Sequence, residues 1–250
     1  MVLRTALVAG FVLLAGVGSA SAQSRDSSSL RDALFGSKPG AGRSAPAPRV
    51  ARYAAGDETF VLDRSGDAPL LKFEGDREVW ALRPTPGPRG DVIYKDDLGR
   101  PVLRFTRLGG LTVFTPDQPS GLPAAASGPA AALRPAAMTA VQLWRHLVRQ
   151  SARASRALGR QIDFEANDVV QGSEAVYADA ASLTAEAISR EAPGLTPQSP
   201  LSRVRKVEFV EGPRASAALE GSSLEITVAP DQGLAGRPSS QRVLTALSGD

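Results

Sequence analysis

The sequence predicts an α+β protein with two structural modules, and three observations lead to that prediction. Short runs of apolar residues, separated by glycine-containing turns, fill residues 53–116. Two long segments with helical spacing follow a stretch at 117–135 that is rich in Pro, Ala and Gly. Strand-like runs alternate with these segments through residues 136–250. We therefore expect an N-terminal antiparallel β module, a linker at 117–135, and a C-terminal α+β module with two main helices and an antiparallel sheet.

The turns decide how the strands of the first module are arranged. Dipeptides such as Gly75-Asp76 and Leu98-Gly99 are too short to join anything but antiparallel neighbours. Six strands are expected, at residues 58–64, 68–74, 78–82, 92–95, 101–106 and 111–115.

The first module also repeats itself. Residues 60–84 align without a gap on residues 92–116, and the aligned pairs include four identities. These are Pro69 with Pro101, Leu71 with Leu103, Phe73 with Phe105 and Pro84 with Pro116. A single three-stranded meander leaves an apolar face in water and is marginally stable. We therefore predict a duplicated meander that forms a six-stranded sheet or small barrel, with coincidental β patterning as the alternative.

The second module is expected to alternate helices and strands. Ser173 precedes the second long helix, Pro193-Gly194 ends it, and Ser239 or Ser240 caps a short final helix. The expected helices are 136–159, 174–192 and one that ends at Leu247; the expected strands are 161–165, 203–211, 215–219 and 224–229.

The first 22 residues have the three parts of a secretory signal peptide. Arg4 supplies a positive charge, residues 6–17 form an apolar run, and Ala20-Ser21-Ala22 provides a small-x-small cleavage site. The run is shorter than the ~20 residues of a membrane span. We expect cleavage after Ala22 and a periplasmic or secreted location in a bacterium, with no transmembrane span in the mature chain. Residues 23–52 then read as a disordered segment, in which 30–35 could form a short helix.

Composition narrows the classes of function. The chain has no Cys and a single His, His146, so disulfides and a zinc site built from His and Cys are not expected. Lack of Cys in an exported chain fits a bacterial periplasm. Removing Arg4 with the leader leaves 28 basic and 26 acidic residues, a net charge of +2. That balance does not predict nucleic-acid binding, and no cofactor motif is present.

One helix face is strongly charged. Five arginines of the first long helix fall at helical spacing, and the sequence has no acidic residue between Arg134 and Arg160. The apolar residues Val141, Leu143, Trp144, Leu147, Val148 and Leu158 are expected on the packing side. The arginines form either a solvated face or a surface for an anionic partner such as phospholipid, lipopolysaccharide or an acidic protein. They are Arg145, Arg149, Arg153, Arg156 and Arg160.

Other possible sites of chemistry are weak. His146 has no nucleophile motif near it. Asp96-Asp97 is expected to be a hairpin turn rather than a calcium loop, and residues 89–91 are expected to be a turn. Glu165 and Asp168 could pair as carboxylates for glycoside hydrolysis. We therefore assign no catalytic, cofactor-binding or metal-binding residue.

Four stretches carry a resemblance to a known family. They are residues 78–82, 87–91, 103–109 and 236–240, which read EVWAL, GPRGD, LRFTRLG and GRPSS. They resemble an uncharacterised family of exported bacterial proteins, a domain of unknown function. The resemblance implies bacterial origin and export, and it carries over no activity, fold or functional residue.

Three functions are compatible with the sequence. The first is a non-catalytic binding or structural protein of the bacterial envelope. The second is a hydrolase of an envelope polymer that uses Asp and Glu. The third is a small-barrel inhibitor of an enzyme that attacks the envelope.

Overall fold

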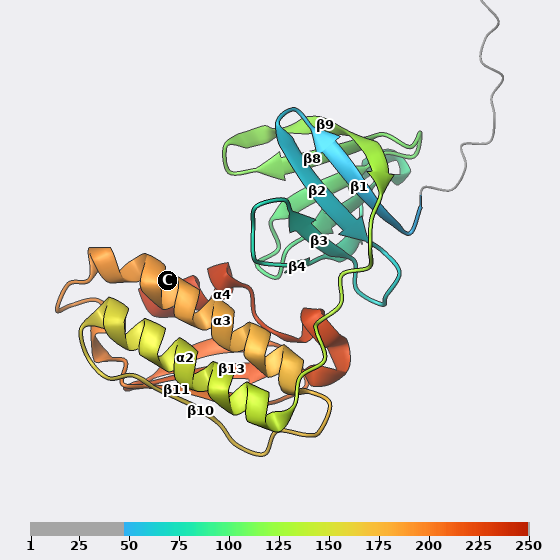
Figure 1. The fold of residues 1–250 in the computed structure, drawn as a ribbon. Coiled ribbons are helices and arrows are strands. Elements are labelled where there is room, and N and C mark those ends of the chain that lie inside the picture. The colour runs from blue at the N-terminus through green and yellow to red at the C-terminus, as the bar shows by residue number, and fades with distance from the viewer. Residues whose placement is uncertain (1–47, 250) are drawn as a thin grey trace, which may run out of the picture. The chain divides into compact units, whose positions relative to one another are not determined.

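The computed structural model describes residues 48–249, and these form two sheets and three α-helices (Figure 1). The predicted signal peptide, the segment 23–47 and the short helix expected at 30–35 lie outside the described residues. Residues from Pro46 onward belong to one compact unit, so contacts between the two modules are part of the fold.

The first module is a single antiparallel sheet of nine strands. Its order is β4-β3-β2-β1-β9-β8-β7-β6-β5, so every strand pairs with a neighbour in sequence except where β9 joins β1. The strands are β1 (Val50–Ala55), β2 (Glu58–Asp63), β3 (Leu70–Phe73), β4 (Trp80–Ala81), β5 (Arg83–Pro86), β6 (Val92–Lys95), β7 (Pro101–Phe105), β8 (Leu111–Thr115) and β9 (Gln118–Pro129).

The two edges of this sheet are joined by the chain itself. Only Leu82 separates β4 from β5, and its side chain is buried in the core. In the middle of the strand order, the first half of β9 pairs with β8 and the second half pairs with β1. Because the edge strands are consecutive in sequence, the sheet curls until it is nearly barrel-shaped, and its inner face becomes the core.

The expectation of six strands is wrong, because β1, β5 and β9 are also present. β1 begins inside the segment expected to be disordered, and β9 occupies most of the expected linker. β5 and β9 contain prolines, which lower intrinsic strand propensity. Each half of β9 pairs on one side only, so a proline there can face away from the ladder. β5 pairs with its neighbour β6, and the second half of β9 pairs with the distant β1, so backbone pairing outweighs the low strand propensity of these segments.

Strand pairing follows the sequence repeat. The pairs Phe60 with Phe73 and Leu62 with Leu71 reappear 32 residues later as Val92 with Phe105 and Tyr94 with Leu103. At the same offset, β1–β4 correspond to β5–β8, so each repeat contains four strands rather than three. The inner faces of both copies supply one core, which holds Phe60, Leu62, Leu71, Tyr94, Leu103 and Val113 among others.

The second module combines three α-helices with a four-stranded sheet. The elements are α2 (Ala140–Leu158), β10 (Asp163–Ala166), α3 (Glu174–Glu191), β11 (Lys206–Glu211), β12 (Ser216–Glu220), β13 (Ser223–Val228), a 3-10 segment at Pro230–Gly236, and α4 (Ser240–Ser248). The sheet order is β10-β11-β13-β12. The expectation of an antiparallel sheet is wrong, because β10 and β13 both run parallel to β11. α3 provides the crossover between the parallel strands β10 and β11, and the edge strand β12 lies in sequence between β11 and β13.

Helix α3 is the centre of this module. Its residues are buried around most of its circumference, since α2, α4 and the sheet all contact it, and Figure 1 shows α2 beside it. Alanines such as Ala180, Ala181 and Ala187 make room for these close neighbours. Ser173 stands at its N-terminus as expected, although its hydroxyl donates to the Val170 carbonyl instead of capping the helix.

Capping residues mark the N-termini of the two outer helices, α2 and α4. Thr139 and Gln142 form a reciprocal capping box at the start of α2. The hydroxyl of Ser239 caps α4 by accepting a hydrogen bond from the amide of Arg242 at 3.0 Å.

Within residues 48–249, no helix combines the length and apolar character that crossing a membrane requires.

Candidate functional site

The outward face of α2 carries the arginines singled out in the sequence. Arg145, Arg149 and Arg156 are exposed, and Arg153 is half-buried. Arg160 lies beyond the end of the helix and is used structurally. Its guanidinium donates to the carbonyls of Leu201 at 2.7 Å and Val204 at 3.0 Å.

The expected packing side of α2 is only partly correct. Leu143, Leu147 and Leu158 are buried, but Trp144 is 65% exposed, Val141 61% and Val148 49%. The buried stripe is narrow because α2 rests mainly on α3 and leaves the rest of its surface in solvent. Trp144, Val141 and Val148 therefore form an exposed apolar row beside Arg145, Arg149, Arg153 and Arg156. We call these seven residues the α2 outer face.

His146 is held in place by a contact with Ser182 of α3. Its Nε2 atom lies 2.7 Å from the hydroxyl of Ser182, which itself donates to the carbonyl of Ala178. The guanidinium of Arg149 lies 3.4 Å from Nδ1, where a catalytic triad would need a carboxylate. Burial, with Arg149 as a second cause, lowers the pKa of His146 and favours the neutral imidazole.

The acidic residues considered in the sequence analysis have individual structural settings. Glu165 lies 3.6 Å from the ammonium of Lys206, and Asp168 is in the turn after β10 with a φ of 59°. Asp96 closes its hairpin by accepting from the amides of Leu98 and Arg100, as the turn interpretation requires. Among residues 48–249, no cluster of three or more acidic or His side chains could hold a metal ion.

The N-terminus of α4 binds two carboxylates from the first module. Ser239 donates its amide to Asp97 at 3.0 Å and its hydroxyl at 2.7 Å. Ser240 donates its amide to Glu78 at 3.0 Å and its hydroxyl at 2.5 Å. The free amides and the dipole of a helix N-terminus favour negative charge. We call Glu78, Asp97, Ser239 and Ser240, together with Arg237, the junction clasp.

Arg237 is the buried centre of the junction clasp. Its guanidinium forms an ion pair with Asp179 of α3 and donates to the carbonyl of Val79 at 2.5 Å. The same group lies 4.0 Å from Glu78. Its side chain is completely buried, and its Nη1 atom has no hydrogen-bond partner among the described residues. Arg237 therefore joins the segment before β4 to α3 and α4 through one planar side chain.

Burial raises the pKa of Glu78, although the bonds from Ser240 and the charge of Arg237 oppose that shift. A carboxyl with a raised pKa beside a second carboxylate, Asp97, is the pattern expected of an acid catalyst. Here, however, both oxygens of Glu78 accept hydrogen bonds from Ser240, and Glu78 does not line the adjacent cavity. The arrangement is suited to joining the modules rather than to proton transfer.

The pH dependence of stability tests this description of Glu78. Its folded pKa lies above the ordinary value of 4.5, so the folded protein holds this proton more tightly than the unfolded chain. Its stabilising contribution is therefore complete below 4.5 and is lost as pH rises through the folded pKa. We expect the stability of the wild type relative to Glu78→Gln to fall with rising pH in urea unfolding from about pH 4 to about pH 8. A difference that stays constant or grows with pH would contradict this assignment.

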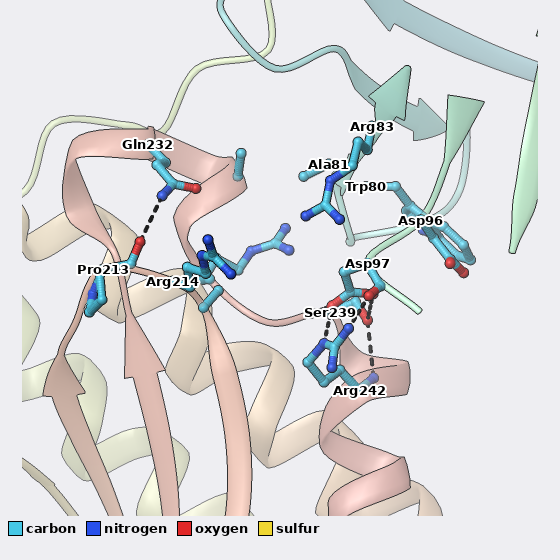
Figure 2. A pocket seen from close by; sticks show the side chains of 13 residues that line it. Trp80, Ala81, Arg83, Asp96, Asp97, Pro213, Arg214, Gln232, Ser239 and Arg242 are labelled. Atoms are coloured by element: carbon cyan, nitrogen blue, oxygen red, sulfur yellow. Dashed lines mark hydrogen bonds and ion pairs between the residues drawn. The ribbon is translucent and has the colours of Figure 1, made fainter. Parts of the chain in front are cut away.

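A cavity of about 570 Å³ lies beside the junction clasp and is lined by both modules (Figure 2). Four arginines reach its wall: Arg83 from β5, Arg214 from the loop between β11 and β12, Arg237, and Arg242 from α4. The lining also includes Trp80, Asp96 and Asp97. The arrangement can bind negative charge.

A comparison with protein families assigns the chain to one of them. A model of the family described as Domain of unknown function (DUF4908) matches residues 29–247. The chain belongs to this family. The match spans both modules and the junction clasp, so the DUF4908 domain is the pair of modules rather than either one alone. No curated protein and no solved structure matches the chain.

Sequence reasoning found the arginines of α2 but missed the junction clasp. Glu78 and the motif at 236–240 stand out in the sequence only through their resemblance to the family, and 158 residues separate Arg237 from Val79. The one local signal is the pair Ser239-Ser240 before an apolar run, which predicts a helix cap but does not say which carboxylates it binds.

Proposed function

We propose that this member of the DUF4908 family is an exported, non-catalytic binding protein of the bacterial envelope, which contacts an anionic lipid surface through the α2 outer face. The sequence of residues 1–22 supports export and cleavage after Ala22. The observation that carries the binding proposal is the exposure of Trp144 and two valines beside a row of arginines.

The arginine row and the apolar row of the α2 outer face match two layers of a lipid surface, the charged headgroups and the apolar boundary beneath them. Guanidinium groups pair with headgroup phosphates, while an exposed Trp and valines enter the apolar boundary beneath them. Helix α2 contains no acidic residue that would oppose this contact. An acidic protein partner, which could use both the arginines and Trp144, is the alternative that the vesicle experiment tests.

The expected strength is modest. Attraction to anionic lipid contributes about 1 kcal/mol for each Arg, so four arginines supply about 4 kcal/mol, which alone is millimolar binding. Partial burial of Trp144 and the valines adds about 2–3 kcal/mol. Together the two rows give a dissociation constant of about tens of micromolar, which rises as salt is added and the attraction is screened.

Vesicle binding by the mature chain tests the proposal. We expect sedimentation with vesicles of phosphatidylglycerol and phosphatidylcholine, and none with phosphatidylcholine alone. Changing Arg145, Arg149 and Arg156 to Ser should weaken binding by about 100-fold. Trp144→Ser should weaken it by about tenfold.

A matched control removes the same charge elsewhere. Arg77, Arg107 and Arg203 are exposed arginines outside α2, and changing all three to Ser should leave vesicle binding within about threefold of wild type. Equal losses in both triple variants would show that only net charge matters. That result, or the absence of binding to the anionic vesicles, would overturn the proposed lipid contact.

A further inference from the structure

We propose that the cavity beside the junction clasp is a binding site for a small polyanion, a molecule with at least two phosphate or carboxylate groups. This site is separate from the α2 outer face and does not depend on the proposed lipid contact. It rests on the charges that line the cavity and on the size of the space.

The acidic residues that line the cavity all have partners within the chain. Both oxygens of Asp97 accept from Ser239, and Asp97 also pairs with Arg242 at 3.1 Å. The carboxylate of Asp96 is used by its own turn and by Arg100, which lies 2.7 Å away. The acids of the lining are therefore already neutralised by groups of the chain.

Two arginines are left without a counter-charge. Within residues 48–249, neither Arg83 nor Arg214 forms a salt bridge or a side-chain hydrogen bond. Figure 2 shows Arg83 reaching into the space from the first module, with Arg214 on the wall formed by the second. Two like charges on facing walls of one cavity repel each other until an anion lies between them.

Arg237 fixes the wall of the cavity rather than contacting the ligand. Its side chain is fully buried, forms an ion pair with Asp179, and has its Nη1 atom 4.0 Å from Glu78. With the hydrogen bond to the Val79 carbonyl, these contacts hold the segment before α4 against the first module, and both parts contribute to the lining.

The lining defines the class of ligand. Guanidinium groups match the two-oxygen edge of carboxylate and phosphate groups, and two unpaired arginines on separate walls favour a ligand with two such groups. A volume of about 570 Å³ is ordinary for a small-molecule site. Because the walls come from β5, from the β11–β12 loop and from α4, the site exists only when both modules are in contact.

Calorimetric titration of the mature chain with citrate and with pyrophosphate, at constant ionic strength, tests the site. We expect at least one of these probes to bind, and Arg83→Gln and Arg214→Gln each to weaken that binding about tenfold. Neither side chain bonds to another group within residues 48–249, so both variants should keep the thermal stability of the wild type. Arg203→Gln, a change of an exposed arginine outside the cavity, should leave the affinity unchanged.

Fluorescence gives a second readout that locates the ligand. Trp80 lines the cavity, and Trp144 is the other of the two tryptophans in the chain. In a Trp144→Phe background, the binding probe should change the Trp80 emission with the same midpoint as the calorimetric titration.

Three results would overturn the site. The first is that neither probe binds at about 10 mM, a concentration at which even very weak complexes are detected. The second is that the wild type and both cavity variants bind the probe with equal affinity. The third is that Arg203→Gln lowers the affinity as much as the cavity variants do. The triple variant of Arg145, Arg149 and Arg156 should bind the probe as the wild type does. Failure of vesicle binding therefore leaves this result unaffected, and the two proposals can fail separately.

Discussion

Replacing Gly236 with Ala is expected to lower the free energy of unfolding by at least about 3 kcal/mol, the upper end of overpacking effects. A Cβ at this position would overlap the carbonyl oxygen of Ala229 and lie 2.7 Å from the carbonyl carbon. Both are backbone atoms and cannot rotate away. Ala229 also donates its amide to the Gly236 carbonyl at 2.6 Å, so relieving the overlap would break this contact. Urea unfolding followed by circular dichroism measures the change.

Gly194→Ala is the matched control for this prediction. Gly194 ends the 3-10 turn after α3, does not have a positive φ, and has no described atom within 4 Å of the place that an added Cβ would occupy. The same added methyl should therefore change stability by no more than about 0.5 kcal/mol. If both substitutions have similar effects, the tight approach of Gly236 to Ala229 is not what requires glycine.

Arg237→Met is expected to lower the free energy of unfolding by about 3 kcal/mol. Removing one partner of a buried ion pair leaves the other charge uncompensated, which costs about 3–5 kcal/mol. The lower end of this range applies because Asp179 keeps 30% of its side chain in solvent. The substitution also removes the hydrogen bond to Val79, so the contact between the modules should weaken. In a Trp144→Phe background, urea unfolding followed by Trp80 fluorescence and, separately, by circular dichroism measures both effects.

Arg242→Met provides the comparison within the same part of the fold. Its side chain is 32% exposed and its partner Asp97 26% exposed, so solvent screens this pair. The expected loss is about 1 kcal/mol, because Ser239 still binds Asp97 through two hydrogen bonds. An Arg237→Met variant no less stable than Arg242→Met would contradict the central position given to Arg237.

The elements with strong local signals were predicted from the sequence. Strand β8 has the expected bounds, and α3 and the β12–β13 hairpin differ by only a residue or so from the expected ones. Capping residues, short turns and apolar spacing act between neighbours in the chain, so the sequence displays them directly. The 32-residue repeat belongs to this group, and the pairing register of β2–β3 and β6–β7 repeats with it.

Several features that were missed depend on contacts between segments that are far apart in the sequence. β9 contains three prolines, and it is a strand because β8 pairs with its first half and β1 with its second. The parallel pairing of β11 with β13 also depends on the whole sheet: β12 takes the edge position, and the β12–β13 hairpin then brings β13 back beside β11. Exposure of Trp144 was also unpredictable, since an apolar residue on an amphipathic helix is normally assigned to the core.

Local periodicity and turn chemistry were enough to predict the internal repeat, most helices and strands, and the arginine row of α2 from the residues alone. Contacts across the fold settle which arginines of the cavity have a counter-charge within the described residues, and where Glu78 and Arg237 meet. A charge acts on whatever the fold places within a few ångströms of it, and 158 residues separate Arg237 from its partner Val79.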